Sequence, residues 1–450
     1  MRRRKLLFGA VLGTALATAA GVGVAVASKS GDQSRDVAAA AKASNAKAKY
    51  VIFLLGDGMG ESEITIARNY QYGAAGRLPG IDAPLLTGDV TTYAVQEDDP
   101  SKPEYVPDSA ATGTAWATGS KTSNGRVSTT AKADKSLPTI FEQVAKKGWA
   151  TGNVSTAEIT DATPAVLASH VNARGCQGPA NMAACPQYKK SAGGPGSIAE
   201  QFVDHRSDVI LGGGKARFDQ KIDGGPYAGK TVIDQAKALG YTVVTDAAGL
   251  DGVKKGPVLG LFTSGNMSLE WKGLPADKPI TGPQVCKENQ RPSNEPSLAA
   301  MTQKAIDLLL AKNSKNFYLQ VEGASIDKQD HAAAPCEQIG ETIAFDDAVQ
   351  VALAFAKTHP KTLIVVTADH AHSSQIVESG SEIQGLGSIL TTKEGVPMEL
   401  SYGTAPKGGS QSHTGAQIRA AAQGPQAANV VGLHDQTELY HLLARATGVE

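Results

Sequence analysis

Three short apolar segments, each running into a carboxylate, constrain the fold of this 450-residue chain more than any other feature. The segments are residues 50–55, 317–321 and 363–367, and the carboxylates at their ends are Asp57, Glu322 and Asp369. A continuous apolar run of this length is typical of a strand that is buried on both faces. Ligands of open α/β sheets bind beyond the carboxyl ends of the strands, so we expect the three carboxylates to converge at one edge.

Segments with helical character lie between these strands, at residues 137–147, 298–311 and 342–358. The alternation predicts an α/β fold with a large central, mostly parallel β-sheet, flanked by helices on both faces, and a metal site at the carboxyl ends of the strands. Residues 374–412 read as rich in loops. No repeat or biased linker divides the chain, so residues 49–450 are predicted to form one catalytic domain.

The first 27 residues have the pattern of an export signal peptide. A basic start at residues 2–5 precedes an apolar run rich in Gly and Ala, which ends in the small residues 25–27. A membrane anchor is the alternative, because the run is slightly long for a signal core. Residues 28–48 are predicted to be a flexible segment. We expect an exported protein, periplasmic or extracellular, without stable membrane insertion after cleavage.

Four cysteines remain after this signal: Cys176, Cys185, Cys286 and Cys336. An even number of cysteines in an exported chain predicts two disulfides. Three pairings can be drawn, of which Cys176–Cys185 with Cys286–Cys336 is the simplest. None of the cysteines stands in a Cys-x-x-Cys array, which argues against a zinc site built from thiolates.

The charge of the chain argues against a nucleic-acid partner. The formal net charge is −1, and no cluster of Lys and Arg follows the extreme N-terminus. Proteins that bind nucleic acid usually carry a basic patch, so we expect no such partner here.

Further residues of metal-binding types lie near the three carboxylates. Asp327 and His331 stand four residues apart, and on a helix that spacing places both side chains on one face. Asp369 is followed directly by His370 at a strand end, whereas His413 stands alone. Carboxylates with imidazoles and without thiolates suit zinc, and carboxylates with hydroxyl groups suit magnesium.

Ser109 is the candidate nucleophile. It follows Pro107 and Asp108 and precedes a segment rich in Ala, which is the pattern of a helix start. Ser109 alone would indicate only a helix cap. The free N–H groups of a helix N-terminus also favour an incoming phosphate. Since serine is a weak nucleophile without help, and no Gly-x-Ser-x-Gly elbow surrounds Ser109, a metal ion is the expected activator.

Several motifs occur together between about Lys49 and the C-terminus. They are Gly56-Asp57-Gly58-Met59-Gly60, Asp108-Ser109-Ala110, Asp161-Ala162-Thr163-Pro164, residues 322–331, Thr367-Ala368-Asp369-His370 and His413-Thr414-Gly415. In this combination the chain resembles the alkaline phosphatases of the Escherichia coli type. The resemblance implies metal-dependent hydrolysis of phosphate monoesters to alcohol and inorganic phosphate, through a phosphoserine intermediate on Ser109.

The resemblance also implies two Zn²⁺ and one Mg²⁺ per subunit, with a role for each matching residue. The first zinc would be held by Asp327, His331 and His413. The second zinc would be held by Asp57, Asp369 and His370. Magnesium would be held by Asp57, Asp161, Thr163 and Glu322. Besides the nucleophile, the groups that handle phosphate would be Arg174, as a clamp, and Lys328, through water.

Two other functions fit part of this pattern. A phosphodiesterase or sulfatase of the same superfold would keep much of the metal site but change the nucleophile and the anion clamp. Ser109 together with Arg174 and Lys328 therefore favours monoesters. A secreted phosphate- or metal-binding protein would not need Ser109. A homodimer is implied as a partner, although the segment before Lys49 is shorter than the arm by which the E. coli type embraces its second subunit.

Overall fold

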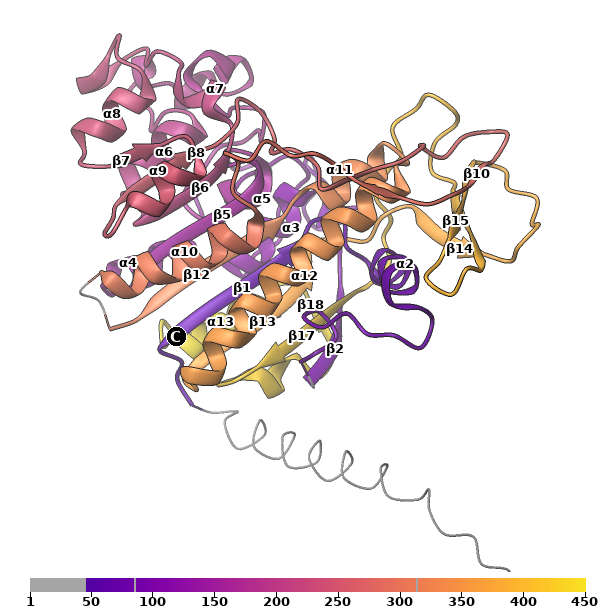
Figure 1. Cartoon of the computed structure of the whole chain (residues 1–450). Helices are drawn as coiled ribbons and strands as arrows, with labels where there is room; N and C mark the ends of the chain where they lie inside the picture. The colour runs from indigo at the N-terminus through magenta and orange to yellow at the C-terminus, as the bar shows by residue number, and fades with distance from the viewer. Residues whose placement is uncertain (1–45, 85, 313–314) are drawn as a thin grey trace, which may run out of the picture.

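The computed structural model describes residues 46–84, 86–312 and 315–450. Its centre is a ten-stranded sheet with the order β18-β2-β17-β13-β1-β12-β5-β6-β8-β7 (Figure 1). In that order the strands span Gly432–Asp435, Leu86–Thr91, Ile418–Gln423, Thr362–Ala368, Tyr50–Gly56, Phe317–Gly323, Ala150–Glu158, Val209–Gly213, Val258–Leu261 and Thr242–Val244. Only β17 runs antiparallel to its neighbours in this sheet, so the predicted, mostly parallel sheet is confirmed.

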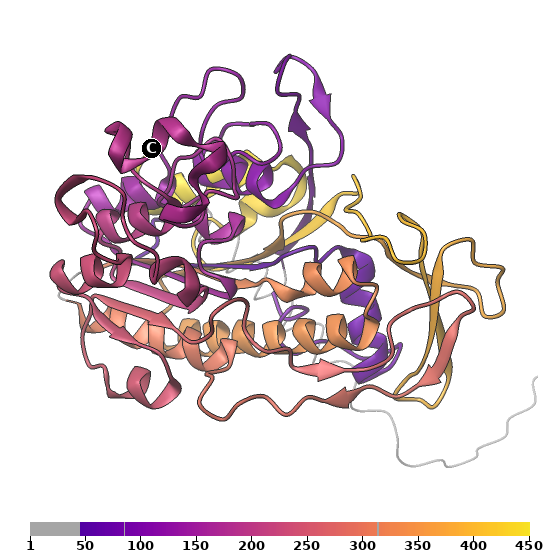
Figure 2. The same ribbon diagram turned by 90° about the horizontal axis from the view of Figure 1, so that it is seen from above.

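Helices cover both faces of the sheet, as predicted. On one face α10 and α12 pack against each other and against β12 (Figures 1 and 2). On the other face α13 contacts α3, α4 and β1. These five helices span Leu298–Ala311 (α10), Pro335–Thr358 (α12), Glu438–Thr447 (α13), Ser109–Thr118 (α3) and Ile140–Lys146 (α4). The remaining helices are α2 (Glu61–Tyr72), α5 (Ala162–Ala165), α6 (Ile198–His205), α7 (Lys215–Phe218), α8 (Val232–Ala238), α9 (Ala247–Gly252) and α11 (Ser325–His331).

Strand β1 lies at the middle of the sheet, between β12 and β13. Its residues 51–55 are fully buried, because helices cover both faces, and this burial accounts for the continuous apolar run. The register aligns Gly56 of β1 with Gly323 of β12 and with Ala368 of β13. The three strands therefore end level with one another, which brings the residues that follow them to one edge.

Helix α12 begins at Pro335, seven residues before the predicted start at residue 342. Proline fits the first turn of a helix because the N–H group that it lacks has no partner there. The helix also continues through Gly340, where a Cβ atom would lie only 2.6 Å from Trp271. The glycine is needed for this close approach to β9 (Trp271–Lys272), and it does not mark a break in the helix.

Residues 374–412 contribute three strands to a second, four-stranded sheet, where the sequence suggested mainly loops. Its four strands follow the order β10-β15-β16-β14 and lie at one side of the main sheet (Figure 1). They span Thr281–Gln284, Leu386–Thr391, Pro397–Tyr402 and Ser374–Val377. The buried residues Leu386, Leu390, Leu400 and Tyr402 form a separate core with residues of α2. Two further pairs of two-residue strands complete the fold. Strand β11 (Lys287–Glu288) pairs with β9, and β3 (Ala94–Val95) pairs with β4 (Pro103–Glu104).

Both predicted disulfides, Cys176–Cys185 and Cys286–Cys336, are present. The predicted signal peptide, residues 1–27, and nearly all of the predicted flexible segment, residues 28–48, lie outside the described residues. None of the helices in the part of the chain that the structure describes combines the length and the apolar character needed to cross a bilayer.

Candidate active site

Two of the three strand-end carboxylates meet around His370. The Nε2 atom of His370 lies 3.5 Å from Oδ1 of Asp57 and 3.1 Å from Oδ2 of Asp369. This contact follows from the level strand ends, since Asp57 follows β1 directly and Asp369 follows β13 directly. Burial, with the neighbouring Asp369, raises the pKa of Asp57 well above its usual value. Burial also lowers the pKa of His370, so its imidazole is neutral at physiological pH, as metal ligation requires.

Gly58 lets the turn after β1 approach helix α11. Its φ angle is +66°, and a Cβ atom on it would lie 2.9 Å from the backbone of Asp327. Its N–H group donates a hydrogen bond to Oδ1 of Asp369 over 2.9 Å. A side chain at this position would push the strand ends away from α11, so the Gly-Asp-Gly motif contributes to the geometry of the site.

A second group of side chains of metal-binding types surrounds Asp327 on α11. Its Oδ1 atom lies 3.4 Å from Nε2 of His331, one helical turn away, and 3.2 Å from Nε2 of His413. The other ring nitrogens face carbonyl groups: Nδ1 of His413 lies 2.9 Å from the Pro107 oxygen, and Nδ1 of His331 faces the Gln411 oxygen. With the proton on Nδ1, each histidine directs the lone pair of Nε2 at the same point. In many metal sites a carbonyl group that accepts a hydrogen bond from Nδ1 orients the histidine in this way.

His372 belongs to this group, although the sequence analysis did not single it out. Its Nε2 atom lies 3.3 Å from Oδ1 of Asp327, and the side chain is fully buried. The side chains of Asp327, His331, His372 and His413 offer ligand atoms that all lie within 4.8 Å of one another. The signal in the sequence was the spacing of two from His370, which places both rings on one side of an extended segment.

Ser109 is the first residue of α3 and is buried beside His370. Its Oγ lies 3.4 Å from Nε2 of His370. The preceding residue, Asp108, is the N-cap and accepts a hydrogen bond from the N–H of Ala111 over 3.0 Å. The structure thus combines both roles that the sequence allowed, since Asp108 caps the helix and Ser109 stands free at its positive end.

Cations line the side of the site next to Ser109. Arg174 binds Asp108 over 3.1 Å and Asp161 over 3.0 Å, and Lys328 binds the other oxygen of Asp161 over 2.8 Å. Burial opposes ionisation of Asp161, but Lys328 and Arg174 hold its pKa below the usual range. The guanidinium and ammonium groups are thereby fixed in place and charged, which suits the binding of an anion.

Glu322 and Thr163 lie on the far side of Asp57. The hydroxyl of Thr163, on α5, lies 3.5 Å from Oδ2 of Asp57. Glu322 is the penultimate residue of β12 and accepts a hydrogen bond from the hydroxyl of Ser155 on β5. Burial raises the pKa of Glu322 to about 7. This part of the site contains oxygen donors, in contrast to the histidines around Asp327.

The donor set fits divalent cations. Four buried atoms at the centre make no hydrogen bond within the described residues: Asp57 Oδ1, Asp327 Oδ1, Asp369 Oδ2 and His372 Nε2. Buried carboxylate oxygens without donors are strongly destabilising unless a cation or a proton neutralises them. Two groups of side chains have the spacing of metal ligands, the one around Asp327 and a second formed by Asp57, Asp327 and His370.

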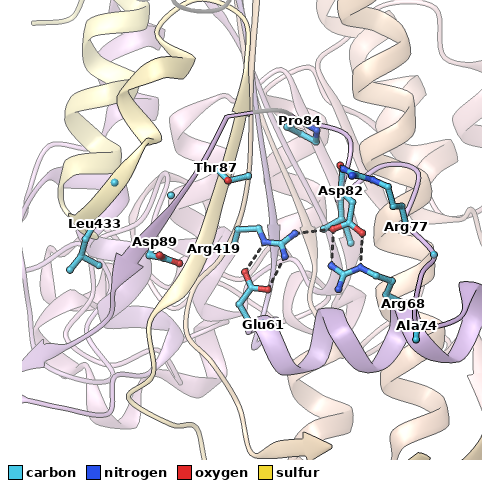
Figure 3. Close-up of a pocket in the computed structure, with 14 residues that line it drawn as sticks. Glu61, Arg68, Ala74, Arg77, Asp82, Pro84, Thr87, Asp89, Arg419 and Leu433 are labelled. Carbon is cyan, nitrogen blue, oxygen red and sulfur yellow. Dashed lines mark hydrogen bonds and ion pairs between the residues drawn. The ribbon is translucent and has the colours of Figure 1, made fainter. Parts of the chain in front are cut away.

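A different charged region lies beside α2. A pocket of about 890 Å³ is lined by Glu61, Arg68, Asp82 and Arg419, and we call it the α2 pocket. Figure 3 shows Arg419 between Glu61 and Asp82, with Arg68 on the other side of Asp82. Arg68 binds Asp82 over 2.7 Å, and Arg419 binds Asp82 over 2.9 Å and Glu61 over 2.7 Å. These four charges neutralise one another.

At the carboxyl edge of the sheet, the buried Ser109 thus lies beside groups of side chains that have the spacing of metal ligands. A family model described as alkaline phosphatase matches residues 48–411, and the chain belongs to this family. The sequence is 52% identical to the alkaline phosphatase of Escherichia coli (strain K12), over 90% of this chain and 88% of that protein. It is 49% identical to the streptomycin-6-phosphate phosphatase of Streptomyces griseus, over 91% of this chain and 93% of that protein.

A solved structure, the alkaline phosphatase of the Antarctic bacterium TAB5, has the same fold. It aligns with a TM-score of 0.66 and 24% identity, covering 90% of this chain and 99% of that one. Hydrolysis of phosphate monoesters is therefore the function expected of this chain. The family match decides for this function over the phosphodiesterase, sulfatase and binding-protein alternatives.

Proposed function

We propose that the chain hydrolyses phosphate monoesters through a covalent phosphoserine on Ser109. The observation that carries this proposal is the position of Ser109, buried at the start of α3 with its Oγ 3.4 Å from His370. In the first step, an O–P bond forms to Ser109 Oγ while the bond from phosphorus to the alcohol oxygen breaks. In the second step, water forms the new O–P bond and Ser109 Oγ leaves, which releases inorganic phosphate.

Arg174 is the clamp for the phosphoryl group. Its guanidinium is held by Asp108 and Asp161, one residue on each side, so its plane is fixed before the substrate arrives. A planar fork can bind two oxygens of a phosphate together, which a lysine cannot do. Lys328 adds positive charge near the same group and is held by Asp161. This preorganisation favours the transition state because no residue has to move as charge develops.

We further propose two zinc ions and one magnesium ion per subunit. The first zinc would be held by Asp327, His331 and His413, with His372 orienting Asp327. The second zinc would be held by Asp57, Asp369 and His370. Magnesium would be held by Asp57, Asp161, Thr163 and Glu322. When bound, the metal ions would supply Lewis-acid stabilisation of the attacking and leaving oxygens.

A trapping experiment tests the nucleophile. Protein supplied with zinc and magnesium is mixed with a ³²P-labelled phosphate monoester, quenched in acid and digested. We expect label on the peptide that contains Ser109 and none on that peptide when the protein carries Ser109→Ala. Label on another residue, or rapid turnover with no labelled protein at any quench time or pH, would contradict the covalent route.

The setting of the protein is part of the proposal. Residues 1–27 would act as an export signal, so that the mature protein works in the periplasm or outside the cell, where its two disulfides are stable. A homodimer is the proposed assembly. Light scattering on the exported protein, together with the sequence of its N-terminus, tests both statements.

Phosphorylated aminoglycosides are a second candidate class of substrate within the same reaction. The support is the similarity to the streptomycin-6-phosphate phosphatase, which covers nearly all of both chains. Turnover of streptomycin 6-phosphate, compared with that of p-nitrophenyl phosphate on one preparation, tests this candidate.

A further inference from the structure

A cleft of about 540 Å³ opens beside the proposed zinc ligand His331, and most of its lining has no role in the reaction described above. His331 and Lys328 form its inner end. Its walls come from residues 276–277, from Leu386 of β15 and from residues 407–410. Since the inner end adjoins the groups proposed to handle phosphate and the leaving oxygen, the cleft lies where the alcohol part of an ester would extend.

One wall of the cleft is a loop that is fixed to the metal-binding helix. The side chain of Gln411 is buried, and its Oε1 accepts hydrogen bonds from the N–H groups of Thr404 and Ala405 over 3.1 Å. The backbone N–H group of Gln411 donates a hydrogen bond to the backbone carbonyl oxygen of His331 over 2.9 Å. The loop from residue 404 to residue 411 is thus closed on itself and anchored to α11, and it presents Lys407 at the rim.

The opposite wall is held by the second sheet. Asp277 and Gly387 exchange two backbone hydrogen bonds of 3.0 Å, which tie residues 276–277 to β15. The backbone of Asp277 is therefore fixed while its carboxylate remains accessible. Asp277 and Lys407 face each other across the rim, with Nζ 2.8 Å from Oδ1.

This ion pair can be replaced by a ligand. The side chain of Lys407 is 65% exposed and that of Asp277 is 37% exposed. Exposed pairs of this kind contribute little because water solvates both charges. An ammonium group on a molecule that is already bound through its phosphate would compete well with Lys407, because it is held near Asp277 at a high effective concentration.

The remaining lining favours a compact, polar molecule. Ala276, Ala332, Gly408 and Gly409 leave room beside His331. Apart from the imidazole of His331, which is a proposed zinc ligand, none of the described residues that line the cleft is aromatic. A nucleobase is usually bound by stacking on an aromatic ring, which this cleft does not offer. A sugar or another polyol fits the small and polar surroundings better.

We propose that this cleft is the subsite for the alcohol part of the substrate and that Asp277 selects phosphate esters of amino-substituted sugars and polyols. The proposal rests on the proposed function, because it requires the phosphate group to bind at Ser109 and Arg174. The ammonium group of such a substrate replaces Lys407 at the Asp277 carboxylate. Lys407 therefore acts as an internal competitor that weakens the selection without abolishing it.

Two sugar phosphates that differ by one ammonium group provide the test. The ratio of kcat/KM for glucosamine 6-phosphate to that for glucose 6-phosphate is measured on the metal-loaded protein. We expect Asp277→Asn to lower this ratio by about 1.5- to fivefold, the range of one exposed charge pair. Lys407→Gln should raise the ratio by a similar factor. The changes should appear in KM, because the contact is present in both the ground state and the transition state.

A matched surface pair serves as control. Lys215, the first residue of α7, and Asp219, the residue directly after this helix, form an exposed ion pair of 2.6 Å outside the cleft. Lys215→Gln and Asp219→Asn make the same changes in charge and should leave the ratio unchanged. If they change the ratio as much as the rim variants do, the effect is one of overall charge and the subsite is wrong.

The outcomes separate this proposal from the proposed function. If the wild type fails to hydrolyse p-nitrophenyl phosphate, the proposed function is wrong, and the proposed subsite is then wrong as well. If the wild type hydrolyses p-nitrophenyl phosphate but Asp277→Asn has the same sugar ratio as the wild type, only the subsite is overturned. A ratio that falls in Lys407→Gln would likewise contradict the competition between Lys407 and the substrate.

Discussion

The active site and the α2 pocket both gather charged side chains, but they differ in how those charges are balanced. In the α2 pocket, Asp82 accepts hydrogen bonds from Arg68, from the N–H of Leu78 and from Arg419. Burial opposes its ionisation, yet these partners lower the pKa of Asp82 to about 2. In the active site, burial raises the pKa of Asp57 well above the usual range, and its Oδ1 has no hydrogen-bond donor among the described residues.

The pairing of the buried charges indicates which of the two regions is arranged to bind a ligand. A buried group that is fully paired with other side chains contributes to the fold and has nothing left to bind. Buried carboxylates without donors cost stability unless something else neutralises them. Volume alone does not make this distinction, because the α2 pocket is roomy but Glu61, Arg68, Asp82 and Arg419 are already paired with one another. The predictions below test whether the two regions separate function from stability.

The largest effect is expected at the nucleophile. Ser109→Ala removes the hydroxyl that accepts the phosphoryl group, so kcat should fall by about a thousandfold or more. Because Ser109 is small and its Oγ makes no hydrogen bond required by α3, the thermal midpoint and the metal content should stay close to those of the wild type. Steady-state rates with p-nitrophenyl phosphate, and metal analysis of the same samples, provide the measurement. A variant that keeps its full kcat would remove Ser109 from the mechanism.

Metal removal should abolish catalytic activity without unfolding the protein. A chelator is expected to abolish turnover, because the arrangement around Asp57 and Asp327 needs cations to balance its charges. The main sheet has its own apolar core, so circular dichroism at 25 °C should change little. The thermal midpoint should fall, since ligands that bind only the folded state stabilise it. Activity should return when zinc and magnesium are added together.

The chelation result can also contradict the metal assignment. If the chelated protein keeps full activity, the proposed metals have no catalytic role. If activity disappears only together with the circular dichroism signal, the metals support the fold and not the reaction.

Much of the site could be predicted because it depends on local patterns. The apolar runs predict β1, β12 and β13, and the i, i+4 spacing of Asp327 and His331 lies on α11. The start of α3 at Ser109 was also readable from Asp108. Each of these features can be predicted from the residues that are its neighbours in the sequence.

Other features depend on partners far away in the sequence. The role of His372 comes from Asp327, which tertiary packing brings to 3.3 Å. The second sheet pairs β10 with β15, about a hundred residues later, and its short strands carry little signal alone. Helix α12 begins seven residues before the predicted start and continues through Gly340, where close contact with Trp271, distant in the sequence, requires a glycine.

A moderate effect is expected at His372, which contacts no substrate in the proposed mechanism. We predict that His372→Ala weakens zinc binding by about tenfold or more, because outer-shell partners orient the ligand that they contact. The rate at saturating zinc should fall less than the affinity. Zinc retention against a competing chelator, with kcat measured at excess zinc, separates the two quantities. His434→Asn, at a partly buried histidine in β18 outside the active site, is the matched control and should change neither.

The smallest effect is expected in the α2 pocket, and it should concern stability alone. Asp82→Asn leaves Arg68 and Arg419 without their shared partner and should lower the free energy of unfolding at pH 7 by about 1–2 kcal/mol, since solvent screens part of the interaction. The value of kcat should not change. Asp89 lines the same pocket and makes no ion pair among the described residues, so Asp89→Asn is the matched control with an expected change near zero.

The pH dependence gives the sign of the Asp82 contribution. The pKa of Asp82 in the folded protein, about 2, is below the ordinary value of 3.8, so the folded state favours the charged carboxylate. Its contribution is therefore complete above about pH 5 and is lost as the pH falls from about 4 towards 2. Denaturant titrations of wild type and Asp82→Asn should differ at pH 7 and converge in that acid range. A constant difference at every pH would mean that shape, and not charge, accounts for the loss. A fall in kcat in Asp82→Asn at pH 7 would contradict the conclusion that the α2 pocket contributes to stability alone, because the pocket would then take part in the function.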